Sequence, residues 1–167
     1  MSTHCYIGAT SPGQPRRVRA RAVLYDAHPH VVLPALAAIW AHHTRHDTAA
    51  LITAILAHDW EHLDPDATTA TTSSSLAGQR TVAGVGVALT STTRGVVDSP
   101  EPVTVFPLCH ARHLDAEWIY LLHPDTDTVT VHSTDGTRIA TYPLHCWSPT
   151  RAPVQRLPQP THGRDDR

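Results

Sequence analysis

The stretch that most constrains the fold covers residues 25–63, because it holds the densest apolar pattern in the chain. Its hydrophobic residues recur every three or four positions, the spacing that places side chains on one face of a helix. A first block contains Val32, Leu36, Ile39, Trp40 and His43. A second block contains Leu51, Ile52, Ile55, Leu56 and Trp60. The stretch therefore predicts two consecutive amphipathic helices that form one layer of the fold.

Local signals indicate where these helices begin and end. Pro34 fits the first turn of a helix but not its interior, so the first helix is expected to begin near Leu33. Asp47 is a typical N-cap for the second helix, since its carboxylate accepts hydrogen bonds from free backbone N–H groups. Pro65 disfavours helical geometry in the residue before it, so the second helix is expected to end near Leu63.

Alternating apolar and polar residues predict strands on both sides of the helices. Residues 5–9 and 17–25 are expected to pair as an antiparallel hairpin before the helices. Later strands are expected at residues 80–90, 103–106, 118–123, 129–132 and 138–142. The last three should form a meander, with Ile119, Leu121, Val129, Val131 and Ile139 or Tyr142 in the core. The predicted fold class is therefore α+β, an antiparallel sheet with the two consecutive amphipathic helices packed on one face.

Length and composition favour one α+β domain over residues 1–147. Residues 64–79 are rich in Thr and Ser and predict a flexible loop. Residues 148–167 are rich in Pro and Arg and predict a disordered tail. Hydrophobic residues make up 41% of the chain, which is enough for a core built mainly from Ala, Val, Leu and Ile.

Charge and cysteine content exclude several classes of protein. A net charge of −2 gives no general attraction to nucleic acid or to an anionic membrane. The sequence shows neither an apolar run long enough to span a membrane nor a signal-peptide core, so we expect a cytoplasmic protein. Three cysteines without a C-x-x-C pair fit a reducing compartment. All 13 basic residues are Arg, which together with abundant Ala, Pro and Thr indicates a high-GC bacterial genome.

Short motifs in the first 63 residues resemble a family of uncharacterised phage and bacterial proteins. That family opens with S-T-x-S/C-x-I-G, and a strand ending in H-x-D-G-Y-P is followed by two helices. The matching residues here are Ser2, Thr3, Cys5, Ile7, Gly8, Asp26, Pro29, Leu36, Trp40, Asp59, Trp60 and Leu63. The chain departs from the pattern at Ala27, His28 and Leu33. The resemblance implies a phage or mobile-element setting and no particular activity.

His58-Asp59-Trp60-Glu61-His62 matches H-x-x-E-H, the inverted signature of some zinc proteases. On a helix, His58 and His62 would share one face and could hold Zn²⁺, with Glu61 as the general base. The alternative is that they are surface or capping histidines, which we favour because the chain has 14 His and no third-ligand helix follows.

Other histidines and the cysteines allow weaker metal hypotheses. His42, His43 and His46 form a second cluster, for which a solvated helix edge is the simpler interpretation. Each cysteine neighbours a histidine, but adjacent residues of a strand point to opposite faces, so each pair offers at most one easy ligand. Buried apolar roles are expected for Cys5 and Cys146, while the role of Cys109 stays open.

Arg17, Arg19 and Arg21 alternate along one expected strand and form a row on one of its faces. Such a row can meet phosphates. Without interleaved aromatic residues, however, a solvated strand face is the simpler interpretation. The row is the only candidate binding surface that the sequence suggests.

The sequence thus predicts a small non-enzymatic binding or regulatory module that acts through protein contacts. It contains no phosphate-binding loop, no G-x-S-x-G and no complete dinucleotide motif. The alternative is a zinc-dependent hydrolase that uses His58, Glu61 and His62. An Arg-mediated nucleic-acid binder is a third and less supported class.

Overall fold

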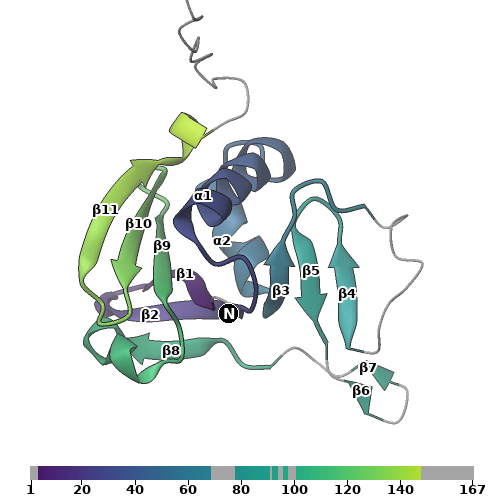
Figure 1. The fold of residues 1–167 in the computed structure, drawn as a ribbon. Helices are drawn as coiled ribbons and strands as arrows, with labels where there is room; N and C mark the ends of the chain where they lie inside the picture. Colours follow the sequence, from purple (N-terminus) through teal and green to yellow (C-terminus); the bar gives the residue numbers. More distant parts are fainter. Residues whose placement is uncertain (1–3, 69–77, 91, 94–95, 98–100, 148–167) are drawn as a thin grey trace, which may run out of the picture.

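The computed structural model describes residues 4–68, 78–90, 92–93, 96–97 and 101–147. They include a nine-stranded mixed sheet that bends around the helices (Figure 1). Its order is β11-β10-β9-β1-β2-β3-β5-β4, and β8 pairs with β2 beside this path. Its strands are β1 (Cys5–Ser11), β2 (Gln14–Val23), β3 (Trp60–Leu63), β4 (Gln79–Val82), β5 (Gly86–Leu89), β8 (Thr104–Pro107), β9 (Trp118–His123), β10 (Thr128–Ser133) and β11 (Arg138–Pro143). A second, two-stranded sheet consists of β6 (Thr92–Thr93) and β7 (Val96–Val97).

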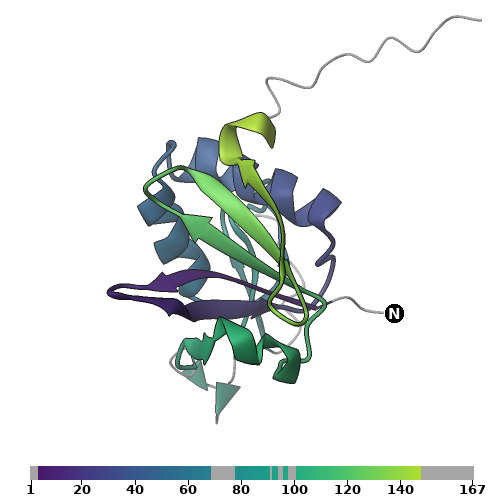
Figure 2. The same cartoon turned by 90° about the vertical axis from the view of Figure 1, so that its left-hand side faces the viewer.

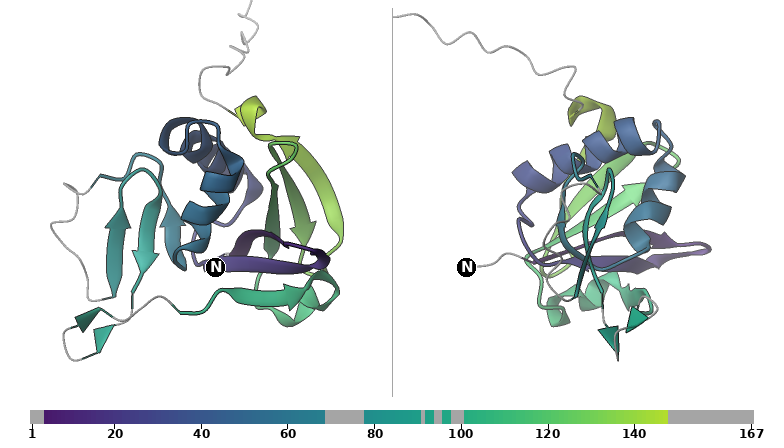
Figure 3. Two further views of the ribbon diagram at one scale, coloured as in Figure 1. Left: turned by 180° about the vertical axis from the view of Figure 1, so that it is seen from behind. Right: turned by 90° about the vertical axis from the view of Figure 1, so that its right-hand side faces the viewer.

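Two helical rods lie inside the bend of the sheet, and their arrangement is clearest from behind and from the side (Figure 3). The first rod joins α1 (Pro29–Ala38) to the π-helix η1 (Ile39–His43), and the second is α2 (Thr48–Leu56). Short 3₁₀ segments follow β8 and β11, namely η3 (Leu108–His113) and η4 (Leu144–Trp147). None of the helices in the described part of the chain has the length and apolar character needed to cross a membrane.

The predicted antiparallel sheet with two helices on one face is wrong. Strands make up 41% of the structure and helices 27%, and the sheet is mixed. β1 runs parallel to β9 and β2 runs parallel to β3. Alternation of apolar residues indicates that a segment is a strand, but it does not show which distant strand will lie beside it. The two parallel pairings therefore have no signature in the sequence.

Several local predictions are confirmed and one is corrected. β1 and β2 form the expected antiparallel hairpin, and β9, β10 and β11 form the expected meander. Residues 80–90, expected as one strand, instead form a hairpin of β4 and β5. Gly84 lies between these strands with φ of 73°, a conformation that glycine adopts readily.

The sheet is covered on both faces, which splits the predicted core in two. The main core lies between the sheet and the helices and includes Val129 and Val131. A smaller core on the opposite face includes residues of β8 and η3. It contains Val18, Ala20, Phe106, Ala111, Ile119 and Leu121. Tyr142 packs against the main core, whereas Ile139 is 55% exposed.

The first helix begins at Pro29 rather than near Leu33. Pro29 stands in the first turn, where a missing N–H costs nothing because that group has no partner inside the helix. Pro34 is accommodated inside the helix, contrary to our expectation. The rod continues through the π-helix, in which Thr44 N–H donates to the Ile39 carbonyl at 3.1 Å.

The second helix begins as predicted but ends earlier. Asp47 is its N-cap, and the Ala50 N–H donates to the Asp47 carboxylate at 2.9 Å. The helix ends at Leu56, and Trp60 to Leu63, expected to continue it, form β3 instead. The last two backbone carbonyls of the helix accept hydrogen bonds from side chains. The Trp60 indole N–H donates to the Ile55 carbonyl at 2.9 Å, and Arg21 Nε donates to the Leu56 carbonyl at 2.9 Å.

Two predictions concern segments that are described in part or not at all. Of the expected flexible loop, residues 64–79, the part from 69 to 77 lies outside the described residues. The whole expected tail, residues 148–167, also lies outside them. The described start of that loop is well packed, because Ala67 is buried and its carbonyl accepts from Gly84 N–H at 2.9 Å.

We predict that Arg21→Met lowers the free energy of unfolding by about 3 kcal/mol, because it strands a buried carbonyl and the Asp59 carboxylate. Arg21 is 3% exposed and also lies 3.5 Å from Asp59. The exposed Arg17→Met is the matched control and should change stability by less than about 0.5 kcal/mol. Urea unfolding measures both, and equal losses would contradict this account.

Candidate binding cavity

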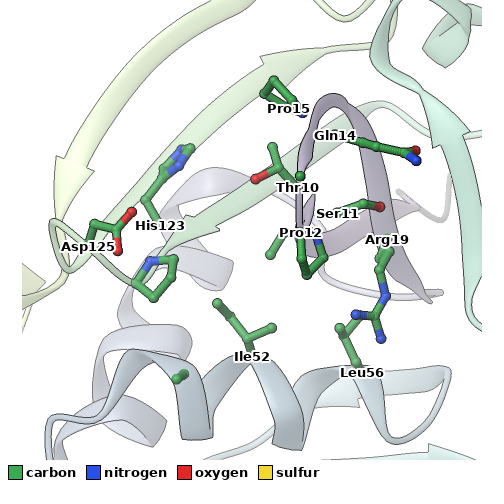
Figure 4. A pocket seen from close by; sticks show the side chains of 14 residues that line it. Thr10, Ser11, Pro12, Gln14, Pro15, Arg19, Ile52, Leu56, His123 and Asp125 are labelled. Atoms are coloured by element: carbon green, nitrogen blue, oxygen red, sulfur yellow. The ribbon is translucent and has the colours of Figure 1, made fainter.

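A cavity of about 460 Å³ lies between the β1–β2 hairpin, α2 and the turn after β9. Its size is in the range typical of small-ligand and peptide pockets. Figure 4 shows Arg19 beside Leu56 on one side of the cavity and His123 with Asp125 on the other. The lining residues are Ala9, Thr10, Ser11, Pro12, Gly13, Gln14, Pro15, Arg19, Ala49, Ile52, Leu56, His123, Pro124 and Asp125.

The cavity exists because two neighbouring parallel strands separate. β1 pairs with β9 from Cys5–Trp118 to Gly8–Leu121, and there the pairing stops. β1 nevertheless continues to Ser11 in its hairpin with β2, which projects past its neighbours in Figure 2. In the described part of the chain, no strand pairs with the outer edge of residues 9–11. The cavity thus lies at the carboxyl ends of two adjacent parallel strands, where ligands commonly bind in α/β proteins.

The floor of the cavity is an apolar face of α2. Ala49, Ile52 and Leu56 follow one another at spacings of three and four residues, so they share one side of the helix. The Thr48 hydroxyl donates to the Asp127 carboxylate at 2.6 Å and ties the start of α2 to the β9–β10 turn. The floor is therefore held at both ends, by Thr48 at its start and by Arg21 at its end.

The arginine row faces α2 and passes from solvent into the core. Arg17 is exposed, Arg19 is half-buried in the cavity wall, and Arg21 is buried against the end of α2. The simpler interpretation, a solvated strand face, therefore fits Arg17 but not Arg21, because the hairpin lies over the end of α2. Among the described residues, the Arg19 guanidinium makes no hydrogen bond and no ion pair.

His123 lies at the other side, next to Asp125. Burial lowers its pKa below the ordinary 6.5, the nearby His132 acts in the same direction, and Asp125 opposes them. Its Nε2 lies 2.8 Å from the Thr130 hydroxyl, which lies 3.1 Å from the Thr141 hydroxyl. His123 is therefore held mainly neutral near pH 7, and sequence analysis did not single it out.

The H-x-x-E-H residues do not share a helix face. His58 lies in the turn after α2, whereas Glu61 and His62 lie in β3, whose pairing with β5 is irregular between Trp60 and His62. The His58 ring packs edge-on against Trp60 with centroids 5.8 Å apart, and burial lowers the His58 pKa. Within the described residues, no three His, Cys, Asp or Glu side chains gather as metal ligands would.

The second histidine cluster also spreads over different elements. His42 and His43 lie in the π-helix, and His46 follows it with its ring packed edge-on against Trp40 at 4.5 Å. His46 has φ of 66° and Arg45 has φ of 53°, so two successive residues adopt the left-handed conformation. This tight reversal carries the chain from one helical rod into the next.

The cysteines occupy unlike environments. Cys5 is fully buried, as expected, and burial raises the pKa of its thiol, which keeps it protonated and unreactive. Cys146, also expected to be buried, is exposed in η4. Cys109 is exposed in η3.

No family model, no curated protein and no solved structure matches the chain. The resemblance to the phage and bacterial family therefore stays a prediction.

We predict that the free energy of unfolding falls as pH drops below about 6.5, and that His123→Gln removes part of this fall. The folded-state pKa of His123 is lowered, so the unfolded chain takes up a proton first and acid favours unfolding. Well above pH 6.5 both states are neutral at this residue, and the two proteins should there differ by a constant amount. Chemical denaturation across pH measures the effect, and parallel curves would refute it.

Proposed function

We propose that the protein is a non-enzymatic binding module that takes an extended segment of a partner protein into the cavity between the β1–β2 hairpin and α2. The observation that carries the proposal is the unpaired edge of residues 9–11, which borders the cavity beside an apolar helix face. Exposed strand edges bind extended peptides through main-chain hydrogen bonds, and adjoining pockets select side chains.

The walls of the cavity suit both the backbone and the side chains of such a ligand. The edge of β1 offers backbone donors and acceptors to a chain that lies alongside it. Side chains of alternate ligand residues would then point toward α2, where Ala49, Ile52 and Leu56 present apolar surface. We therefore expect the bound segment to carry an apolar residue that packs on this floor.

A binding role is favoured over catalysis by how the polar groups are engaged. Nucleophilic catalysis needs a hydroxyl or thiol within hydrogen-bond reach of a base. Among the described residues, the Thr10 and Ser11 side chains make no hydrogen bond with His123, whose Nε2 faces Thr130. The cavity therefore offers recognition groups without a paired nucleophile and base.

We predict that Ile52→Glu weakens partner binding by at least about tenfold, because it places a carboxylate on the apolar floor. Thr53→Glu is the matched control, since it adds the same charge to the neighbouring exposed position of α2. Proteins captured from a host extract by the full chain would be compared for wild type and both variants, after circular dichroism confirms folding.

The proposal requires at least one captured protein that the wild type and Thr53→Glu retain and Ile52→Glu loses. A set of captured proteins that is identical for all three forms would overturn it, because binding would then not involve the cavity.

A further inference from the structure

We propose that the cavity binds the C-terminal carboxylate of an extended peptide and that Arg19 is the residue that holds it. This inference rests on the proposed function and adds the chemistry of the ligand. Three observations carry it: the burial gradient of the arginine row, the unpaired guanidinium of Arg19, and the closure of the groove behind it.

The groove opens at the hairpin tip and closes toward the core. Successive arginines on the helix-facing side of β2 change from exposed Arg17 to half-buried Arg19 to buried Arg21. The Arg21 guanidinium contacts the Leu56 carbonyl and Asp59, so it fills the space between β2 and the end of α2. Arg19 is thus the last cation that a ligand entering from the tip can reach.

The charge of Arg19 has no counterpart among the described residues. Among the described residues, the one ion pair joins Arg21 to Asp59. Asp125, the acidic residue of the lining, lies across the cavity from Arg19 (Figure 4). A half-buried guanidinium with unused donors favours a carboxylate, which it can bind through two parallel hydrogen bonds.

The space around Arg19 fits a chain end better than an acidic side chain. From Gly8 back to Cys5, the edge of β1 is already paired with β9, since Gly8 pairs with Leu121. A strand that extends along residues 9–11 from the tip must therefore stop there. Ala9 is the cross-strand partner of Arg19, so the two side chains lie on the same face of the hairpin and both line the cavity.

The same geometry fixes the direction of the ligand. β1 runs from Gly8 toward Ser11, whereas the ligand would run from the tip toward Gly8. The bound segment would therefore lie antiparallel to β1, with its last residue near Ala9. An N-terminal amine at the same place would meet Arg19 as a like charge, which is unfavourable.

The test uses two libraries of random short peptides on the surface of a carrier, offered to the full chain. In the first library each peptide ends the polypeptide with a free carboxylate, and in the second a fixed Gly-Ser extension follows it. We expect enrichment from the first library only, with an apolar residue near the end. Ile52→Glu should lose the enriched peptides, and Thr53→Glu should retain them.

The best peptide would then be synthesised as the free acid and as the C-terminal amide. Fluorescence polarisation should show at least about tenfold weaker binding for the amide, and the same loss for Arg19→Gln with the acid. The Arg19→Gln variant should bind the acid and the amide equally well, because both changes remove the same interaction, that between the guanidinium and the terminal carboxylate. Arg19→Lys should keep part of the preference for the acid, and Arg17→Gln should change nothing.

Two results overturn the inference in different ways. Equal enrichment from both libraries, with acid and amide bound alike by wild type, would refute the carboxylate and leave the binding cavity in place. No enrichment from either library by the folded protein would count against the cavity as a peptide site altogether.

Discussion

One buried guanidinium connects the three elements on which the rest of the structure depends. Arg21 reaches from β2 to the last carbonyl of α2 and to Asp59, while the Ala22 N–H donates to the same carboxylate at 2.9 Å. These contacts hold the end of α2 and the following turn against the hairpin, so the chain enters β3 beside β2. Favourable charge at a helix C-terminus and a satisfied carboxylate together compensate for burying an arginine.

Parallel pairing of β1 with β9 sets the second constraint. The paired segments lie more than 100 residues apart in the sequence, and their pairing brings the β9–β10 turn next to the hairpin. Tyr120 adds a further link, since its hydroxyl donates to the Ala27 carbonyl at 2.7 Å from within the main core. The pairing stops at Gly8 while β1 continues to Ser11. The separation of β1 from β9 therefore creates both the free strand edge and the cavity.

The sequence is informative where structure is determined by near neighbours along the chain. The N-cap at Asp47, the β1–β2 hairpin and the β9–β10–β11 meander are local and were predictable. The end of α2 was not, because Trp60 and Arg21 cap it through contacts that depend on tertiary packing. His123 and Arg19 face one cavity for a similar reason, and of these two residues Arg19 alone stood out in the sequence, as a member of a regular row.

That row shows why periodicity alone cannot assign a role. Arg17, Arg19 and Arg21 share one face of one strand, yet each has a different dielectric environment because the hairpin is tilted against α2. An exposed guanidinium is solvated by water, and a buried one must be paired within the fold. The intermediate position is the one at which a guanidinium is partly desolvated and still reachable from outside. An anionic ligand therefore gains most at Arg19, even though the chain as a whole carries a net charge of −2.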